Sequence, residues 1–392
     1  MRVKTGLDTI SEKMHPKLKG KKTGLLFHAP SIDSSFAHIT SIFTEEHGCR
    51  QGALFGPQHG IYGQTQDNMI EWEGSVHKEF RVPVYSLYGE HRKPTPDMLN
   101  GLEAFVVDLQ DVGARLYTYI WTVKLCMEAC ADAGIPVFVL DRPNPIGGMQ
   151  ADGPVLKEKY FTFVGGASIP MCHRMTIGEM AVWIRDRYIP RCDLTVIMME
   201  GWRRKMLYRE TGLPWVLPSP NMPTPETAIV YPGTVLAEAL NISEGRGTVI
   251  PFELIGAPFI NTDKLIADLN TRRLPGCIFR AHDYIPTFNK FRNTTCHGVQ
   301  IHVTDIAVYR PVLTALHLFD SMIRTSPAGS VSFNPPPYEY EYSLMPFDIL
   351  SGDSRMREVL TSGLSLQEEK ERWDEEIREF TREFGEIALY KE

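Results

Sequence analysis

Polar and ionisable side chains gather where predicted strands of this chain end. Gln58 and His59 follow one apolar run, Asp108 follows another, and Asp141 follows a third. In an open parallel sheet, ligands bind beyond the carboxyl ends of the strands, so convergent polar groups there predict a functional cleft. Taken singly, these aspartates could equally cap the segments that follow them. The polar segments lie at residues 28–30, 56–60, 89–93, 108–111 and 141–145.

A second polar cluster, NISEGRGT, lies at residues 241–248. It places Asn241, Glu244 and Arg246 beside glycines, which let a backbone approach a ligand closely. The alternative is an ordinary solvated turn with one charge pair. We favour a functional loop, because a Pro-rich segment before it predicts a crossing that carries this loop over the edge of the sheet.

These residue types suit a polyhydroxylated ligand that carries a carboxylate. Carboxylates and amides bind hydroxyl groups, tyrosines stack on sugar faces, and arginine grips an anion through two parallel hydrogen bonds. Glycoside hydrolysis needs a carboxylic acid and a second nucleophilic, basic or orienting group. Candidates for both are Glu90, Asp108, Asp111 and Glu244.

Other chemistries have less support in the sequence. It contains no phosphate-binding or dinucleotide-binding glycine fingerprint, no G-x-S-x-G elbow and no H-E-x-x-H motif. A metal site built from His59, Asp108, Asp111 and Asp141 is an alternative that the spacing does not require.

The elements that position these residues alternate between strand and helix in the first half of the chain. Such alternation predicts an α/β fold with a mostly parallel sheet and helices on both faces. We expect an α/β lobe over residues 1–210, a Pro-rich irregular crossing over 211–232, and an α+β lobe over 233–392. Strands are predicted at 23–27, 50–55, 82–88, 104–107, 136–140, 194–199 and 299–303, and helices at 34–43, from 95 onward, and at 119–133, 176–187, 312–323 and 365–384.

The final predicted helix carries the apolar stripe Leu366, Trp373, Ile377, Phe380 and Phe384. A stripe at helical spacing on a charged helix predicts docking on the body of the protein. Residues 335–337 are three consecutive prolines and predict an extended loop.

Composition limits the class of protein. The chain has 392 residues, 43% of them hydrophobic, and a net charge of −7. These proportions exclude a disordered chain and argue against nucleic acid or an anionic membrane as a partner. The N-terminus has no apolar signal region and no stretch is long enough to span a membrane, so we expect a soluble cytoplasmic protein unless a leader was removed.

Several ordered stretches resemble the exo-β-N-acetylmuramidase family, enzymes of peptidoglycan recycling that release N-acetylmuramic acid from the non-reducing end of cell-wall fragments. The resemblance runs from about residue 24 to about residue 353 and rests on FGPQHGIYG, PVYSLYG, KPTPDML, DLQDVGARLYTYIWT, VLDRPNPIGG, PSPNMPT and NISEGRGT. It implies a Rossmann-like lobe, a smaller C-terminal lobe and an active site between them. It also implies a muropeptide or a muramic-acid disaccharide as substrate, with no cofactor and no metal.

This sequence departs from the family pattern at Gln58, where the resemblance implies a catalytic glutamate before His-Gly. An amide cannot act as a general acid or a carboxylate base. Either another carboxylate carries the step, or the chemistry differs, or the protein binds a sugar without turnover. A second departure is CHRM at residues 172–175, where the family typically has Arg-His-Gly-Met.

A substrate-assisted route is also open, in which the acetamide of the sugar attacks and Gln58 orients it. Arg115, Arg142 or Arg246 would then grip the lactyl carboxylate. The candidate catalytic residues are Asp108, Asp111, Glu244, Gln58 and His59, and the candidate substrate-binding residues are Glu90, Arg115, Tyr117, Tyr119, Asp141, Arg142, Asn144, Asn221, Asn241 and Arg246.

Overall fold

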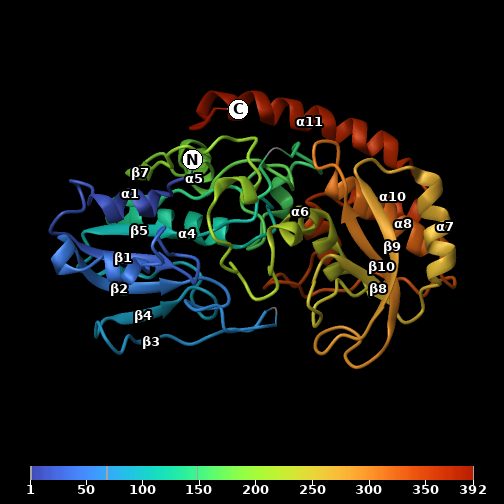
Figure 1. The fold of residues 1–392 in the computed structure, drawn as a ribbon, viewed down its shortest axis with the longest axis horizontal. Coiled ribbons are helices and arrows are strands. Elements are labelled where there is room, and N and C mark those ends of the chain that lie inside the picture. The colour runs from blue at the N-terminus through green and yellow to red at the C-terminus, as the bar shows by residue number, and fades with distance from the viewer. Residues whose placement is uncertain (1, 68, 148, 392) are drawn as a thin grey trace.

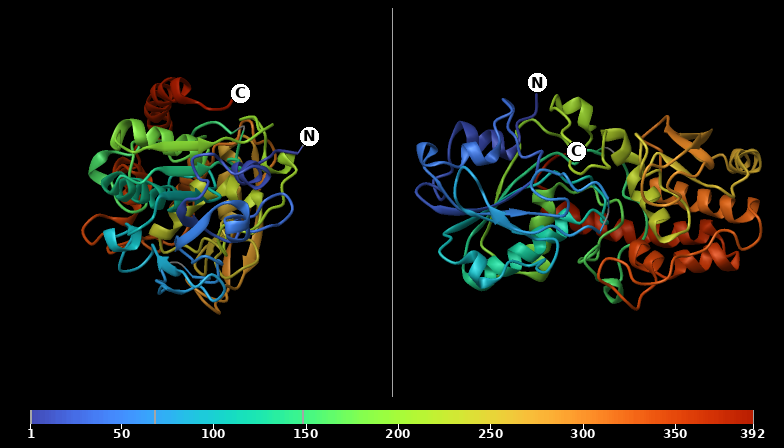
Figure 2. Two further views of the ribbon diagram at one scale, coloured as in Figure 1. Left: turned by 90° about the vertical axis from the view of Figure 1, so that its left-hand side faces the viewer. Right: turned by 90° about the horizontal axis from the view of Figure 1, so that it is seen from below.

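Two lobes lie side by side along the long axis of the molecule (Figure 1). The computed structural model describes residues 2–67, 69–147 and 149–391, so Gly148 of the VLDRPNPIGG stretch lies outside the described residues. The N-terminal lobe holds a larger sheet with helices on both faces, and the C-terminal lobe holds a smaller sheet packed among helices (Figures 1 and 2).

The described residues of the first lobe form a seven-stranded sheet in the order β3-β4-β2-β1-β5-β6-β7. All neighbouring strands pair in parallel except β3 with β4. This arrangement confirms the predicted α/β class and its mostly parallel sheet. The strands are β1 (Lys22–Phe27), β2 (Arg50–Gly56), β3 (Ser75–Val76), β4 (Pro83–Ser86), β5 (Ala104–Asp108), β6 (Val137–Leu140) and β7 (Leu194–Ile197).

Alternate residues of the strands feed apolar clusters on opposite faces of this sheet. In β1, Leu26 packs in the cluster that includes α4 and α5, whereas Leu25 and Phe27 pack in the cluster that includes α1 and α2. This is the period of two expected for a sheet buried on both sides. The helices of this lobe are α1 (Gly6–Glu12), α2 (Ile39–Ile42), α3 (Pro96–Leu99), α4 (Tyr119–Ala133) and α5 (Ile177–Tyr188), with short 3-10 turns η1 (Glu45–His47), η2 (Glu158–Tyr160) and η3 (Tyr208–Thr211).

The predicted helix over residues 34–43 is wrong for most of its length, because only Ile39–Ile42 is helical. Asp33 Oδ1 accepts hydrogen bonds from the backbone amides of Ser35 (2.8 Å) and Ala37 (2.9 Å), and Phe36 has a left-handed φ of 66°. A side chain that bonds the local backbone in this way competes with the helical hydrogen bonds.

The C-terminal lobe is built around a three-stranded antiparallel sheet, in the order β8-β10-β9 over the described residues. Its predicted strand at 299–303 and helix at 312–323 are confirmed as parts of β10 and α8. Its elements are α6 (Pro225–Thr234), η4 (Val235–Ala239), β8 (Leu254–Ala257), α7 (Thr262–Arg272), β9 (Cys277–Tyr284), β10 (Cys296–Val303), α8 (Pro311–Thr325), α9 (Pro346–Ser351), α10 (Arg355–Ser362) and α11 (Leu366–Ile387).

The predicted crossing between the lobes is irregular only in its first part. From Pro225 onward it is helix α6, which packs against α8 of the C-terminal lobe. Thr224 caps the helix, because its hydroxyl accepts a hydrogen bond from the amide of Thr227 (3.2 Å). Pro225 suits the first helical position, because the N–H that proline lacks would have no partner there. Pro232 lies within the last turn. The helix therefore begins where the proline spacing supplies a start signal.

Helix α11 lies across both lobes and contacts α5 of the first and α8 of the second (Figures 1 and 2). Trp373, Phe380 and Phe384 are buried, and Phe380 meets Trp183 of α5 at 5.1 Å between ring centroids. The predicted docking of this stripe on the body is confirmed. Within the described part of the chain, no helix is both long and apolar enough to span a membrane.

Candidate active site

A cleft lies at the carboxyl ends of the sheet, where the chain order changes direction. Strand β1 is flanked by β2 on one side and β5 on the other, and ligands of doubly wound sheets bind at such a switch point. The first lobe contributes the loop after β2 and the segment that leads into α4. The second lobe contributes α6, η4 and two loops. The described side chains that line the cleft include Gln58, His59, Tyr117, Thr118, Tyr119, Asn221, Tyr231, Glu238, Arg246, Phe252, Tyr338 and Glu339.

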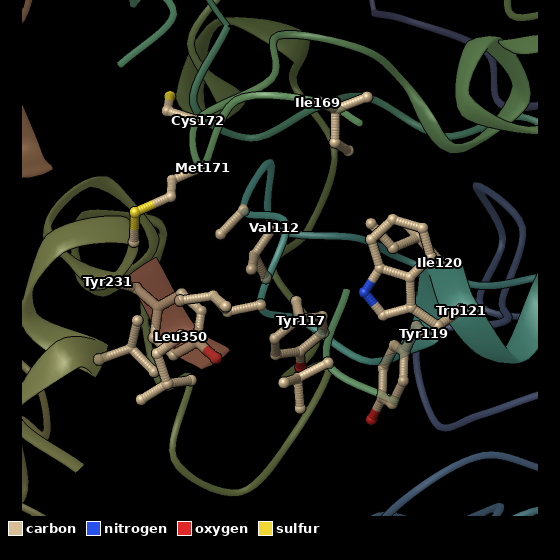
Figure 3. Packing of buried hydrophobic residues seen from close by; sticks show 14 of the residues in the cluster. Val112, Tyr117, Tyr119, Ile120, Trp121, Ile169, Met171, Cys172, Tyr231 and Leu350 are labelled. Atoms are coloured by element: carbon tan, nitrogen blue, oxygen red, sulfur yellow. The ribbon is translucent and has the colours of Figure 1, made fainter. Parts of the chain in front are cut away.

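Aromatic rings form a continuous wall of this cleft. Tyr117 meets Tyr119 at 4.7 Å and Tyr231 at 5.9 Å between ring centroids, both edge to face, and Figure 3 shows these three rings in a row. Tyr231 in turn meets Phe252 at 4.8 Å, and the Arg246 guanidinium lies 4.9 Å from the Phe252 ring centre. Rings locked by edge contacts present a rigid surface on which a sugar face can stack.

The loop after β2 directs Gln58 and His59 into the cleft. His59 has a left-handed φ of 70°, and its Nδ1 lies 2.8 Å from the carbonyl oxygen of Thr65. Burial lowers the pKa of His59 to about 4, so the imidazole is neutral at neutral pH. The Thr118 hydroxyl donates to Gln58 Oε1 (2.7 Å), which leaves the amide nitrogen of Gln58 to act as the donor.

Glu339 faces Gln58 from the second lobe. It is only 5% exposed, and its carboxyl is hydrogen-bonded by Gln58 and by the Tyr88 hydroxyl, which donates to Oε2 at 3.0 Å. Burial and the nearby Glu238 carboxylate raise the pKa of Glu339 to about 7, with the two donors and the Arg246 guanidinium acting in the opposite direction. This carboxyl therefore titrates near neutral pH.

A chain of charges forms the neighbouring wall. Arg246 Nη2 donates to Glu238 Oε1 (2.6 Å), and Arg246 Nε lies 3.2 Å from Glu244 Oε1. Lys290 Nζ pairs with the other Glu244 oxygen at 3.1 Å, and Tyr338 donates to Glu238 Oε2 at 2.6 Å. Burial disfavours the charged guanidinium, but the two carboxylates outweigh it and raise the pKa of Arg246. Glu244 stands behind Arg246 and does not line the cleft.

Asp108 lies outside the lining of the cleft, in a buried ion pair. Arg142 donates through Nε to Oδ1 (2.5 Å) and through Nη2 to Oδ2 (2.8 Å). The two predicted site residues therefore bind each other. Burial raises the pKa of Asp108, against the effect of Arg142. Such a fork ties the end of β5 to the segment that follows β6.

Asp141 is also engaged within the fold. Its oxygens accept from Thr176 Oγ1 (2.7 Å), the Gly178 amide (2.8 Å) and Tyr390 Oη (2.7 Å). Burial raises the pKa of Asp141 to about 7. This aspartate thereby anchors the start of α5 and the C-terminal segment.

The other predicted residues outside the cleft lining also bond within the fold or face solvent. Asp111 accepts from the Gly113 amide (2.6 Å), and Arg115 donates to the carbonyls of Pro154, Ile169, Leu350 and Ser351 at 2.8 to 3.2 Å. Asn144 donates to Met175 O (3.0 Å), and Asn241 donates to Ser330 O (2.8 Å). The Glu90 side chain is 88% exposed.

The structure thus brings together Gln58, His59, Tyr117, Tyr119, Asn221 and Arg246 of the predicted set. For the metal alternative, the described residues contain no group of three His, Cys, Asp or Glu side chains arranged to hold an ion. Sequence reasoning missed Tyr88, Thr118, Tyr231, Glu238, Tyr338 and Glu339. The available signal was PPPYEYEY at residues 335–342, where acidic and aromatic residues alternate directly after three prolines.

Comparison with known proteins identifies the family. The family model for the N-terminal part of exo-β-N-acetylmuramidase NamZ matches residues 23–226, and the C-terminal model matches residues 229–390. The chain is 43% identical to peptidoglycan β-N-acetylmuramidase NamZ of Bacillus subtilis (strain 168), over 99% of this chain and 92% of that protein.

Two crystal structures of DUF1343 family proteins from Bacteroides fragilis have the same fold. One has a TM-score of 0.88 at 32% identity and covers 100% of this chain and 99% of its own. The other has a TM-score of 0.76 at 27% identity and covers 100% of both chains. With both family models and a full-length relative in agreement, the chain belongs to the exo-β-N-acetylmuramidase family.

Proposed function

We propose that this protein is an exo-acting glycoside hydrolase that releases N-acetylmuramic acid, or a related amino sugar, from the non-reducing end of peptidoglycan fragments. Membership of the family supports the reaction class. The observation that carries the proposal for this chain is the cleft itself, which combines a buried carboxyl at Glu339, a wall of aromatic rings in edge-to-face contact and one buried arginine.

The lining matches the parts of an N-acetylmuramic acid unit. The rings of Tyr117, Tyr119 and Tyr231 offer faces and edges to the apolar side of a sugar ring. Among the described lining residues Arg246 carries the cationic side chain, and we assign it to the lactyl carboxylate. Asn221 and the Gln58 amide supply polar contacts to the acetamide and the hydroxyl groups.

The test is release of free N-acetylmuramic acid from the β-1,4-linked disaccharide of N-acetylmuramic acid and N-acetylglucosamine. The purified full chain is incubated with this disaccharide, and products are followed by mass spectrometry. A disaccharide of two N-acetylglucosamine units, which lacks the lactyl ether, serves as the matched control and should be cleaved far more slowly. Saturable binding in calorimetry without product over hours would instead support a sugar-binding protein.

A further inference from the structure

We infer that Glu339 is the general acid of this reaction and carries the proton transfer that Gln58 cannot perform. The inference rests on the proposed function and extends it to a residue on the second lobe, far from Gln58 in the chain. Its basis is the placement of the Glu339 carboxyl against Gln58 inside the cleft.

The two carboxyl groups that line the cleft have different hydrogen-bond partners, which indicates different roles. Among the described lining residues, the carboxyl groups belong to Glu238 and Glu339. Glu238 is bound through one oxygen by Arg246 and through the other by Tyr338, both at 2.6 Å. Glu339 is instead held by the neutral donors Tyr88 and Gln58. A carboxyl among neutral donors can keep its proton, whereas one paired with a guanidinium is an acceptor.

The backbone at Glu339 is held in a conformation that a glutamate rarely adopts. Residues 338–341 form a tight turn, in which Tyr338 N donates to Glu341 O (2.8 Å) and Glu341 N donates to Tyr338 O (2.9 Å). The two central residues, Glu339 and Tyr340, have φ values of 44° and 68°. Turns with two positive φ angles favour Asn and Gly, and such backbone outliers cluster at functional sites.

Contacts with the first lobe hold this turn in place. Tyr340 Oη donates to Glu71 Oε1 (3.0 Å), and the Arg92 guanidinium lies 3.9 Å from the Tyr340 ring centre. The turn therefore inserts a second-lobe carboxyl against first-lobe residues, and its position relative to Gln58 is determined from both sides.

The protonation behaviour agrees with this geometry. With a pKa raised to about 7 by burial, the Glu339 carboxyl is partly protonated at neutral pH. General acids are most effective when their pKa lies near the working pH.

The reaction proceeds in two steps, with Glu339 as acid in the first and as base in the second. The Glu339 carboxyl gives its proton to the glycosidic oxygen while the bond from that oxygen to C1 breaks and the acetamide oxygen of the sugar bonds to C1. Water then adds to C1 and loses its proton to the Glu339 carboxylate, while the bond from C1 to the acetamide oxygen breaks. The products are the free amino sugar and the shortened fragment, and Glu339 is protonated again.

Glu339→Gln tests this role against a merely structural one. On the disaccharide, kcat should fall about 10³-fold or more. On the 4-nitrophenyl glycoside of N-acetylmuramic acid, bond cleavage should fall much less, because nitrophenolate leaves without a proton. Glu341→Gln is the matched control, since Glu341 belongs to the same turn but its side chain accepts from Ser343 and Leu344, and it should keep activity within about twofold.

The outcomes distinguish this inference from the proposed function. If the wild type releases no N-acetylmuramic acid, the function itself fails. If the wild type is active and Glu339→Gln slows nitrophenolate release in the first turnover as much as it slows cleavage of the disaccharide, or slows neither, then Glu339 is not the acid. Thermal melting of each variant checks folding. If Glu339→Gln does not fold, the dependence of kcat/KM on pH in Tyr88→Phe tests the inference instead. A profile identical to that of the wild type would overturn it.

Discussion

At the residue scale, the chemistry of this protein depends on Gln58 and Glu339, which meet across the two lobes. Thr118 orients the Gln58 amide so that its nitrogen can donate to Glu339, and Tyr88 supplies a second donor. Both donors and the Arg246 guanidinium favour the ionised carboxyl, whereas burial and the Glu238 carboxylate favour the protonated one. The balance of these effects sets the pH at which the acid loses its proton.

Tyr88→Phe should move the loss of activity to higher pH. The Tyr88 hydroxyl bonds the Glu339 carboxylate and lowers the pKa of Glu339, so its removal raises that pKa. The acid acts in its protonated form, and activity disappears as pH rises through the pKa, about 7 in the wild type. The measurement is kcat/KM from pH 5 to 9. Tyr85→Phe, a nearby tyrosine of β4 outside the cleft lining, should leave the profile unchanged.

Gln58→Glu should create a coupled pair of carboxyls. Two carboxyls in hydrogen-bond contact share one proton, so the pair releases its last proton at a higher pH than Glu339 alone. We expect the fall of kcat/KM at basic pH to shift to higher pH by about one unit or more. An unchanged limb would show that the side chains at positions 58 and 339 do not interact in solution.

At the element scale, irregular segments carry the polar contacts that join helices of one lobe to loops of the other. Asp152, on such a segment, accepts from the Val312 amide at the start of α8 (2.8 Å) and pairs with Arg310 Nε (2.8 Å). A carboxylate at a helix N-terminus satisfies free amides and favours the helix dipole. Helix α8 therefore begins where a residue distant in sequence caps it.

Asp152→Asn should destabilise the protein by about 3 kcal/mol, because position 152 is fully buried and the neutral amide removes its ion pair with Arg310. The measurement is the free energy of unfolding in urea. Glu375→Gln, an exposed change on α11, serves as the control and should alter stability by less than about 0.5 kcal/mol. Equal stability of Asp152→Asn and the wild type would show that the cap contributes little.

At the scale of the whole molecule, the cleft exists only while the lobes keep their relative position. Helix α11 packs on α5 and α8, and Arg115 ties Pro154 and Ile169 to the carbonyls of Leu350 and Ser351 near the end of α9. Catalysis depends on groups held within a fraction of an ångström, so these contacts support the site without touching it.

Trp373→Ala should test the docking of α11. Trp373 is fully buried, and truncation of such a side chain leaves a cavity that lowers stability by about 3–5 kcal/mol. Thermal melting and kcat measured together are informative, because loosened lobes should lower kcat even below the melting temperature. Glu375→Ala, on the exposed face of the same helix, should change neither.

The amino-acid sequence alone predicts the class of fold, most strands of the larger sheet and one side of the cleft. Helix α4 forms over Tyr119–Ala133 as predicted, because its apolar spacing and the Gly134 stop are local signals. The ends of parallel strands meet at one edge of the sheet, so Gln58 and His59 could be placed there from periodicity alone.

Tertiary structure decided which charged residues share the cleft. Asp108 ends β5 and Asp141 follows β6, but their side chains bind partners elsewhere in the fold, which are Arg142, Thr176 and Tyr390. Glu339 reaches Gln58 only because the second lobe folds back and inserts a turn against the first. No local pattern encodes a contact between residues so far apart in the chain, and burial, which raises the pKa of Glu339, arises only when both lobes close around it.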